Sequence, residues 1–312
     1  MNQMTPGQAR AVDPILSEVA RGYRSPKAAI ASILFPIVTV TSRGGKIITF
    51  GPDDFKLVST VRAPGTNTKR VQFGYAGADF SLVDYRLEAM TPYEIQEEAA
   101  AVPGIDLIAM SIRKVQNVMA LEREYQASVL ARNADNYGAN NKETLSSTGQ
   151  WSHVDSDPIA DVMDAKEAIR QQIGERPNVM TLGPKVLTAL RNHPKILARL
   201  STAADRPPAS IAQLQALFEL EQVVEGQATY HDGAVFQDVW GKDAILAYTT
   251  PASLAEMGSP NYGYTYQLSG RPVVEEGYDD RNANSWVNPV ADARKPVLAG
   301  ASAGFIFKAA VA

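Results

Sequence analysis

Residues 105–132 read IDLIAMSIRKVQNVMALEREYQASVLAR, and this stretch predicts one long amphipathic helix. At 1.5 Å per residue, about 30 residues of helix would span about 45 Å, longer than an average globular helix. We therefore expect a spine on which other elements pack. A coiled coil is the alternative, but the pattern covers too few heptads and meets no partner repeat. The apolar residues recur at steps of three and four, apart from one step of six before Tyr125: Ile105, Ile108, Ile112, Val115, Met119, Tyr125 and Val129.

Ahead of this helix the apolar pattern has a period of two, which predicts β-strands. The first predicted hairpin turns at Gly44 and Gly45 and pairs residues 37–41 with residues 46–50. A longer hairpin with a polar tip is expected over residues 55–80. Its strands contain too few apolar residues to bury both faces, so it would be marginal by itself. We expect it to lie over a neighbour.

Residues 1–36 predict an N-terminal arm. Asp13 followed by Pro14 begins a short helix, because aspartate caps a helix and proline suits its first position. Such a short helix is not stable alone. A second short apolar run ends at Pro36, so we expect the arm to dock on something larger. An ordinary N-terminal helix folded onto its own core is an alternative of about equal weight.

Beyond the long helix, residues 133–153 become polar and contain glycine, which predicts a loop and a domain boundary. A helix capped by Asp157 and ended by Gly174 follows, and Ser210 begins another helix with a capping box. This mixture predicts an α+β fold whose last strand pairs back into an earlier sheet. The expected strands lie at 179–182, 220–230, 244–248, 262–268, 273–278 and 305–308.

The composition sets limits on function. The 312 residues suffice for one elaborate domain or two modest ones, and a net charge of −4 provides no global attraction to nucleic acid or anionic lipid. The absence of cysteine excludes disulfides and cysteine chemistry, and it fits a reducing cytosol. No stretch approaches the roughly 18 apolar residues of a membrane span, and we expect no signal peptide.

The motifs of enzymes and metal sites are incomplete in this sequence. Ser302 lies in a G-x-S-x-G pattern, but no histidine or acidic residue follows it, as a nucleophile elbow requires. Residues 280–284 imitate the start of a calcium-binding loop, but Ser285 stands where glycine is needed. We therefore predict no enzymatic activity, catalytic residue, cofactor or metal. The three histidines are far apart and lack helical zinc-ligand spacing: His153, His193 and His231.

Short motifs follow one another along nearly the whole chain. They are Asp13-Pro14, Gly22-Tyr23, Leu34-Phe35-Pro36, Arg62-Ala63-Pro64-Gly65, Leu121-Glu122-Arg123-Glu124, Gly149-Gln150-Trp151-Ser152, Asp157-Pro158, Arg176-Pro177-Asn178-Val179, Leu190-Arg191-Asn192-His193-Pro194 and Trp240-Gly241-Lys242. Each alone also suits a turn, a cap or a core position. Their order resembles the major capsid proteins of tailed bacteriophages, which adopt the Hong Kong 97 type of fold.

The resemblance implies a division of the chain into parts. In that family the arm and the extended hairpin, called the E-loop, reach across to neighbouring subunits. The implied parts are an N-terminal arm at 1–45, the E-loop at 46–90, a peripheral domain with the spine helix at 91–154, an axial domain at 155–265, and C-terminal strands at 266–312 that return to the peripheral domain.

The resemblance also implies a function. We expect a non-enzymatic virion subunit, assembled in the host cytoplasm into hexamers and pentamers of an icosahedral head around double-stranded DNA without sequence specificity. Scaffolding, portal and decoration proteins are expected partners, and a membrane is not. Maturation would proceed from a procapsid. The candidate inter-subunit contact residues are Arg62, Pro64, Asn67, Lys69, Arg70, Tyr23 and Phe35.

Three other functions remain open on sequence alone. A cellular encapsulin would share the shell fold and enclose an enzyme. A hydrolase built on Ser302 would react with a fluorophosphonate probe. A phage decoration or tail subunit would form a trimer, ring or tube instead of an icosahedral shell.

Overall fold

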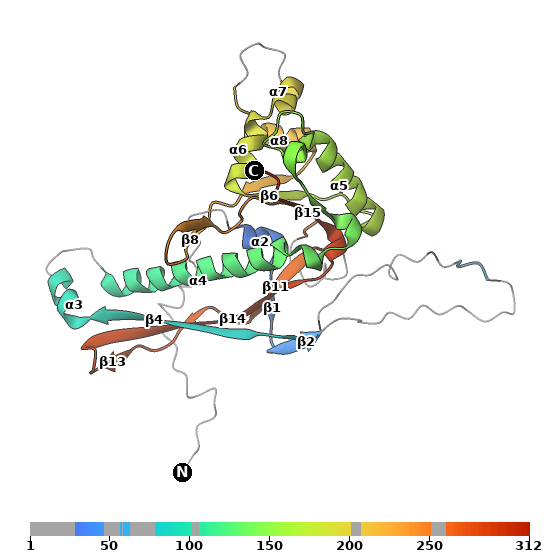
Figure 1. Ribbon diagram of the computed structural model, residues 1–312. Coiled ribbons are helices and arrows are strands. Elements are labelled where there is room, and N and C mark those ends of the chain that lie inside the picture. The colour runs from blue at the N-terminus through green and yellow to red at the C-terminus, as the bar shows by residue number, and fades with distance from the viewer. Residues whose placement is uncertain are drawn as a thin grey trace.

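The computed structural model describes residues 29–46, 57, 59–62, 79–100, 106–200, 207–250 and 260–312. Two sheets lie on either side of the long helix α4 (Leu107–Arg132), which confirms the predicted spine (Figure 1). One sheet has six strands and the other has five. None of the helices in these ranges is long and apolar enough to cross a membrane.

The six-stranded sheet is organised around β14, which runs for 14 residues and pairs along ten of them with β4. Ile112, Val115 and Met119 of α4 pack against this sheet at Val274 and Val290. This apolar contact fixes the first half of α4 on the sheet. The strands are β1 (Ile37–Val40), β4 (Val83–Pro92), β11 (Gly263–Leu268), β12 (Val273–Val274), β13 (Tyr278–Asp280) and β14 (Ser285–Leu298), and α3 (Tyr93–Ala100) follows β4.

The five-stranded sheet has the order β5-β15-β10-β6-β7 and lies within a cluster of short helices (Figure 1). Its core contains Trp151, Ile169, Met180, Ile245 and Phe307, all fully buried or nearly so. The strands are β5 (Lys142–Thr144), β6 (Val179–Leu182), β7 (Gln222–Glu225), β10 (Ala244–Ala247) and β15 (Gly304–Lys308); the helices are α5 (Pro158–Ile173), α6 (Pro184–Asn192), α7 (Pro194–Leu200) and α8 (Ile211–Phe218).

The remaining elements are short. Helix α2 packs beside α4, the pair β2 and β3 lies at the base of the predicted E-loop, and β8 and β9 form a small hairpin near the end of α4. Their bounds are α2 (Ile30–Leu34), β2 (Gly44–Lys46), β3 (Asp79–Ser81), β8 (Thr229–His231) and β9 (Phe236–Asp238), with 3-10 turns at Ala134–Asn136, Ala139–Asn141, Ser147–Gly149 and Ala301–Ala303.

The predicted helix ends are confirmed. The Asp157 side chain accepts a hydrogen bond from the Ala160 N–H at 3.2 Å, and α5 ends at Gly174, whose φ of 76° suits glycine. Ser210 and Gln213 form the expected capping box on α8. These ends could be predicted because each depends on residues a few positions apart.

The predicted hairpin around Gly44 and Gly45 is wrong. Strand β1 pairs in parallel with β11, and β2, which contains both glycines, pairs with β3. A Cβ at Gly45 would lie 2.9 Å from Cε1 of Phe80, so glycine here permits close packing across a strand pair rather than a turn. The second strand of the predicted hairpin, beyond residue 46, lies outside the described residues.

The C-terminal strands divide between the two sheets. Strand β14 lies in the six-stranded sheet, and its return to a peripheral domain remains a prediction. Strand β15 lies between β5 and β10 in the five-stranded sheet, which confirms the expected last strand that pairs back into an earlier sheet. The consecutive apolar residues Phe305, Ile306 and Phe307 explain this position, because both faces of the strand are buried.

Candidate functional site at the subunit surface

The described part of the predicted E-loop exposes apolar side chains. Leu57 is 101 % exposed and Val61 is 84 % exposed, and this segment lies far from both sheets (Figure 1). Arg62, a predicted contact residue, is also exposed there. Arg62 is thus accessible to a neighbouring subunit, and its contact remains a prediction.

The other predicted contact residues divide into two groups. Phe35 is 0 % exposed, and its ring lies 5.5 Å from that of Tyr262, so the prediction for Phe35 is corrected: it belongs to the core of its own chain. Phe35 directly follows α2, and α2 packs against β11. Five predicted residues lie outside the described residues: Tyr23, Pro64, Asn67, Lys69 and Arg70.

Glu124 connects three parts of the chain. Its buried carboxylate accepts hydrogen bonds from the Ile30 N–H at 2.9 Å, the Ala31 N–H at 3.1 Å and Nε1 of Trp240 at 2.8 Å. Burial raises the pKa of Glu124, and these hydrogen bonds oppose that shift. The carboxylate therefore satisfies the free N–H groups at the start of α2 and holds α2 on α4.

The second half of α4 differs from the predicted apolar stripe. Tyr125 and Val129, expected in the core, are 43 % and 55 % exposed. The buried positions are instead Ala127, Ser128 and Ala131. Small residues are needed on this face because α2 packs closely against it, and the larger residues consequently face outward.

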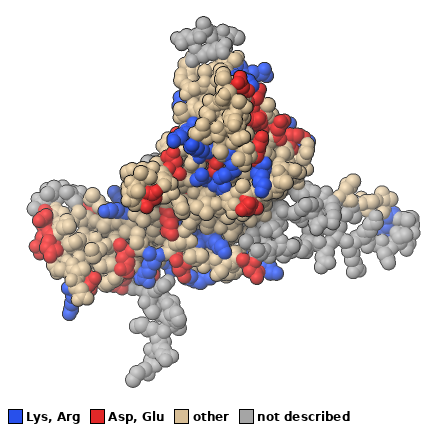
Figure 2. All heavy atoms as spheres, viewed as in Figure 1, with Lys and Arg blue, Asp and Glu red and all other residues tan. Residues whose placement is uncertain are grey.

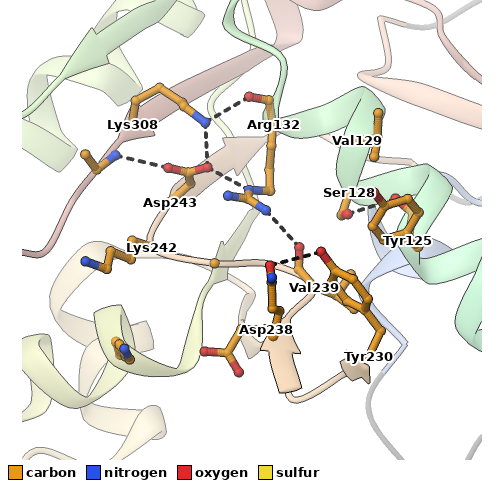
Figure 3. A pocket seen from close by; sticks show the side chains of 14 residues that line it. Tyr125, Ser128, Val129, Arg132, Tyr230, Asp238, Val239, Lys242, Asp243 and Lys308 are labelled. Carbon is orange, nitrogen blue, oxygen red and sulfur yellow. Dashed lines mark hydrogen bonds and ion pairs between the residues drawn. The ribbon is translucent and has the colours of Figure 1, made fainter. Parts of the chain in front are cut away.

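A pocket of about 540 Å³ lies where α4 ends (Figure 3). Asp243 lies at its base, with Oδ2 at 2.7 Å from both Nε of Arg132 and Nζ of Lys308. Burial alone would raise the pKa of Asp243, but the hydrogen bonds from Lys308 and Arg132 outweigh it and lower the pKa. Two further lysines, Lys185 and Lys242, line the pocket. Sequence analysis missed this group because its members come from separate elements.

A buried charge network joins β14 to α4. Arg294 pairs with Asp292 at 2.6 Å, donates to the Met119 carbonyl at 3.1 Å and lies 4.5 Å above the Tyr85 ring. Gln267 donates to Asp292 at 2.8 Å. Because buried charges are tolerated when they are paired and hydrogen-bonded, this network positions the helix on the sheet.

Of the residues considered for catalysis or metal binding, His153 and His193 lie together, and the others do not join them in the described ranges. Ser302 lies in a 3-10 turn before β15. Nε2 of His193 lies 3.1 Å from both Ser156 Oγ and the His153 carbonyl, while His231 lies on the β8 strand. Within the described ranges no group of three histidine, cysteine, aspartate or glutamate side chains could hold a metal. Asp280 accepts hydrogen bonds from the N–H groups of the turn that follows it.

Comparisons with known proteins agree with this architecture. Residues 28–288 match the family described as phage major capsid protein E. The major capsid protein of Burkholderia phage BcepMu is 32 % identical over 95 % of this chain and 96 % of its own length.

Solved structures give the same result. The crystal structure of a phage-related protein from Bordetella bronchiseptica RB50 matches with a TM-score of 0.81 and 43 % identity, covering 97 % of this chain and 98 % of that one. The capsid structure of cyanophage P-SCSP1u matches with a TM-score of 0.58 and 10 % identity, covering 92 % and 89 %, which supports the fold alone. The chain therefore belongs to the phage major capsid protein E family, whose members are non-enzymatic capsid subunits with the Hong Kong 97 fold.

Proposed function

We propose that this subunit assembles with copies of itself into the hexamers and pentamers of an icosahedral head that encloses double-stranded DNA. The observation that carries the proposal is the exposure of Leu57 and Val61, which have almost no packing within their own chain. Burial of each such side chain contributes about 1.5–3 kcal/mol. A neighbouring subunit supplies the missing surface.

The parts of the chain have separate roles in this proposal. The segment between β2 and β3 is the E-loop that reaches the neighbour, and it ends before β4, because β4 pairs along its whole length with β14. The arm lies ahead of β2, α4 is the spine, and the five-stranded sheet is the axial domain. Scaffolding, portal and decoration proteins are further proposed partners. The net charge of −4 fits a container that holds DNA without sequence-specific contacts.

Electron microscopy of the purified full-length protein, expressed alone and with its genomic neighbours, tests this function. We expect closed shells of uniform diameter. Small oligomers or open tubes under both conditions would overturn the proposal and favour a decoration or tail subunit. An enzyme cargo inside the shells would support the encapsulin alternative.

A double variant tests the observation that carries the proposal. Leu57→Ser with Val61→Ser should remain folded by circular dichroism, because neither side chain packs in the subunit, and should lose shells. Val154→Ser is the matched control, since Val154 is also exposed but lies outside the segment. Unchanged assembly of the double variant would contradict the assigned role of the segment.

A further inference from the structure

The pocket at the end of α4 has an excess of positive charge. Its lining contains four cations and two carboxylates, Asp238 and Asp243. Asp243 engages Arg132 and Lys308, whereas the side chains of Lys185 and Lys242 are exposed and form no hydrogen bond or ion pair with any described residue. The basic pocket is defined as Arg132, Lys185, Lys242 and Lys308.

One wall of the basic pocket is partly apolar. Tyr125 and Val129 project from α4, and the Tyr230 ring lies 5.1 Å from that of Tyr125 in an edge-to-face arrangement (Figure 3). On the other side Lys242 lies beside Asp243, which is held by ion pairs with Arg132 and Lys308. The pocket thus presents the unpaired side chains of Lys185 and Lys242 next to an apolar wall, and these cations suit a carboxylate on a partner.

An opposite excess of charge lies along α5. Glu143 on β5 and Asp164 on α5 are exposed, and Asp161 is half-buried, with one carboxylate oxygen 2.8 Å from Nε1 of Trp151. Partial burial, followed by the charges of Asp161 and Asp164, raises the pKa of Glu143. These three carboxylates, called the acidic edge, therefore repel one another in the isolated subunit.

The two surfaces are separate on one molecule. Figure 2 shows basic side chains gathered on the visible face above α4 and acidic side chains along the edge formed by α5. No cation of the basic pocket forms an ion pair with the acidic edge among the described residues. The side chains of Lys185 and Lys242 in the pocket and of Glu143 and Asp164 at the edge therefore form no ion pair among the described residues of one subunit.

We propose that the acidic edge of one subunit docks against the basic pocket of the next copy, so that adjacent subunits meet head to tail. The inference rests on the proposed function, because hexamers and pentamers are closed rings. Two different surfaces of one chain that meet head to tail generate such a ring when the rotation between copies closes. Complementary charge would fix the register and suppress wrong pairings. The partner is a second copy of this chain, recognised by its carboxylates.

Charge reversal tests the pairing in the full-length protein. Lys242→Glu and Asp164→Lys should each raise the concentration needed for half-maximal shell assembly by about tenfold, equivalent to about 1.4 kcal/mol. The combined variant should recover most of this loss, because it restores opposite charges across the interface. Asp164→Lys should also raise the melting temperature of the free subunit, since it removes repulsion within the acidic edge. A purely structural defect would lower it.

Controls separate this inference from the proposed function. Lys114→Glu makes the same charge change at an exposed position of α4 outside the pocket and should assemble normally. If the wild type forms shells but both reversals assemble unchanged, or the combined variant is not rescued, the docking is wrong and the capsid function stands. If Lys242→Glu instead abolishes binding of a double-stranded DNA oligonucleotide to shells, the pocket binds phosphate and the docking is overturned. A wild type without shells rejects the proposed function itself.

Discussion

At the scale of single residues, the buried side chain of Glu124 accepts the hydrogen bonds that a local helix cap would otherwise accept at the start of α2. Three donors from α2 and the loop at Trp240 converge on its carboxylate. An N-terminal helix of only five residues has little stability of its own. The carboxylate and the apolar contacts of Ile30 and Leu34 therefore determine that α2 forms here.

Removing this acceptor should destabilise the subunit. Glu124→Ala leaves three buried donors without a partner, and we expect a loss of about 3 kcal/mol in the free energy of unfolding. Glu124→Gln retains one acceptor oxygen and should lose about 1 kcal/mol. Chemical denaturation of the two variants measures the difference. Equal stability of Glu124→Ala and the wild type would show that these hydrogen bonds contribute nothing.

The same residue gives a pH dependence. Because the pKa of Glu124 in the folded protein is raised above its ordinary value of 4.5, the folded state holds the proton more tightly than the unfolded state. The raised pKa adds to the free energy of unfolding. This addition is fully present below pH 4.5 and is lost as the pH rises through the pKa of Glu124 in the folded protein. The stability advantage of the wild type over Glu124→Gln should therefore shrink as the pH rises. A constant difference across this range would contradict the assignment.

At the scale of elements, the close contact of two backbone segments limits which residue can occupy the contact position. Helix α6 begins after Gly183, and a Cβ there would lie 1.9 Å from the Gly241 carbonyl oxygen, which belongs to the loop before β10. Only glycine allows these two segments to touch. The contact also fixes the loop that presents Lys242 to the basic pocket.

Gly183→Ala should therefore cost about 2–3 kcal/mol, the upper part of the range for overpacking. Gly149→Ala is the matched control, because a Cβ at Gly149 meets nothing within 4 Å, and it should change stability by less than about 0.5 kcal/mol. Thermal and chemical unfolding of both variants distinguish them. Equal effects would show that the Gly183 contact relaxes freely.

The elements also show what the sequence could predict. Caps at Asp157 and Ser210 were predictable because they depend on neighbours in sequence. The pairing of β1 with β11 was not, because the two strands are more than 200 residues apart and Gly44-Gly45 suggested a local turn. The basic pocket was unpredictable for the same reason. Arg132 at the end of α4 and Lys308 on β15 are 176 residues apart in sequence.

At the scale of the whole molecule, two sheets share α4, and the segment at Leu57 and Val61 extends away from both. Leu57 and Val61 are largely exposed in the free subunit. Assembly should therefore protect the backbone N–H groups of this segment from hydrogen exchange. Hydrogen exchange of residues 59–62 should slow when free subunits form shells, whereas exchange of β10, buried in the core, should not change. Unchanged exchange at 59–62 would contradict a neighbour contact there.

The position of β15 has a consequence for synthesis. Of the strands in its sheet, β15 comes last along the chain, yet it lies between β5 and β10 and brings Phe305, Ile306 and Phe307 into the core. A ribosome that stops before Gly304 releases a chain with two unpaired strand edges and an open core. We expect such a fragment not to fold into the subunit, so interrupted translation products should be kept out of the particle.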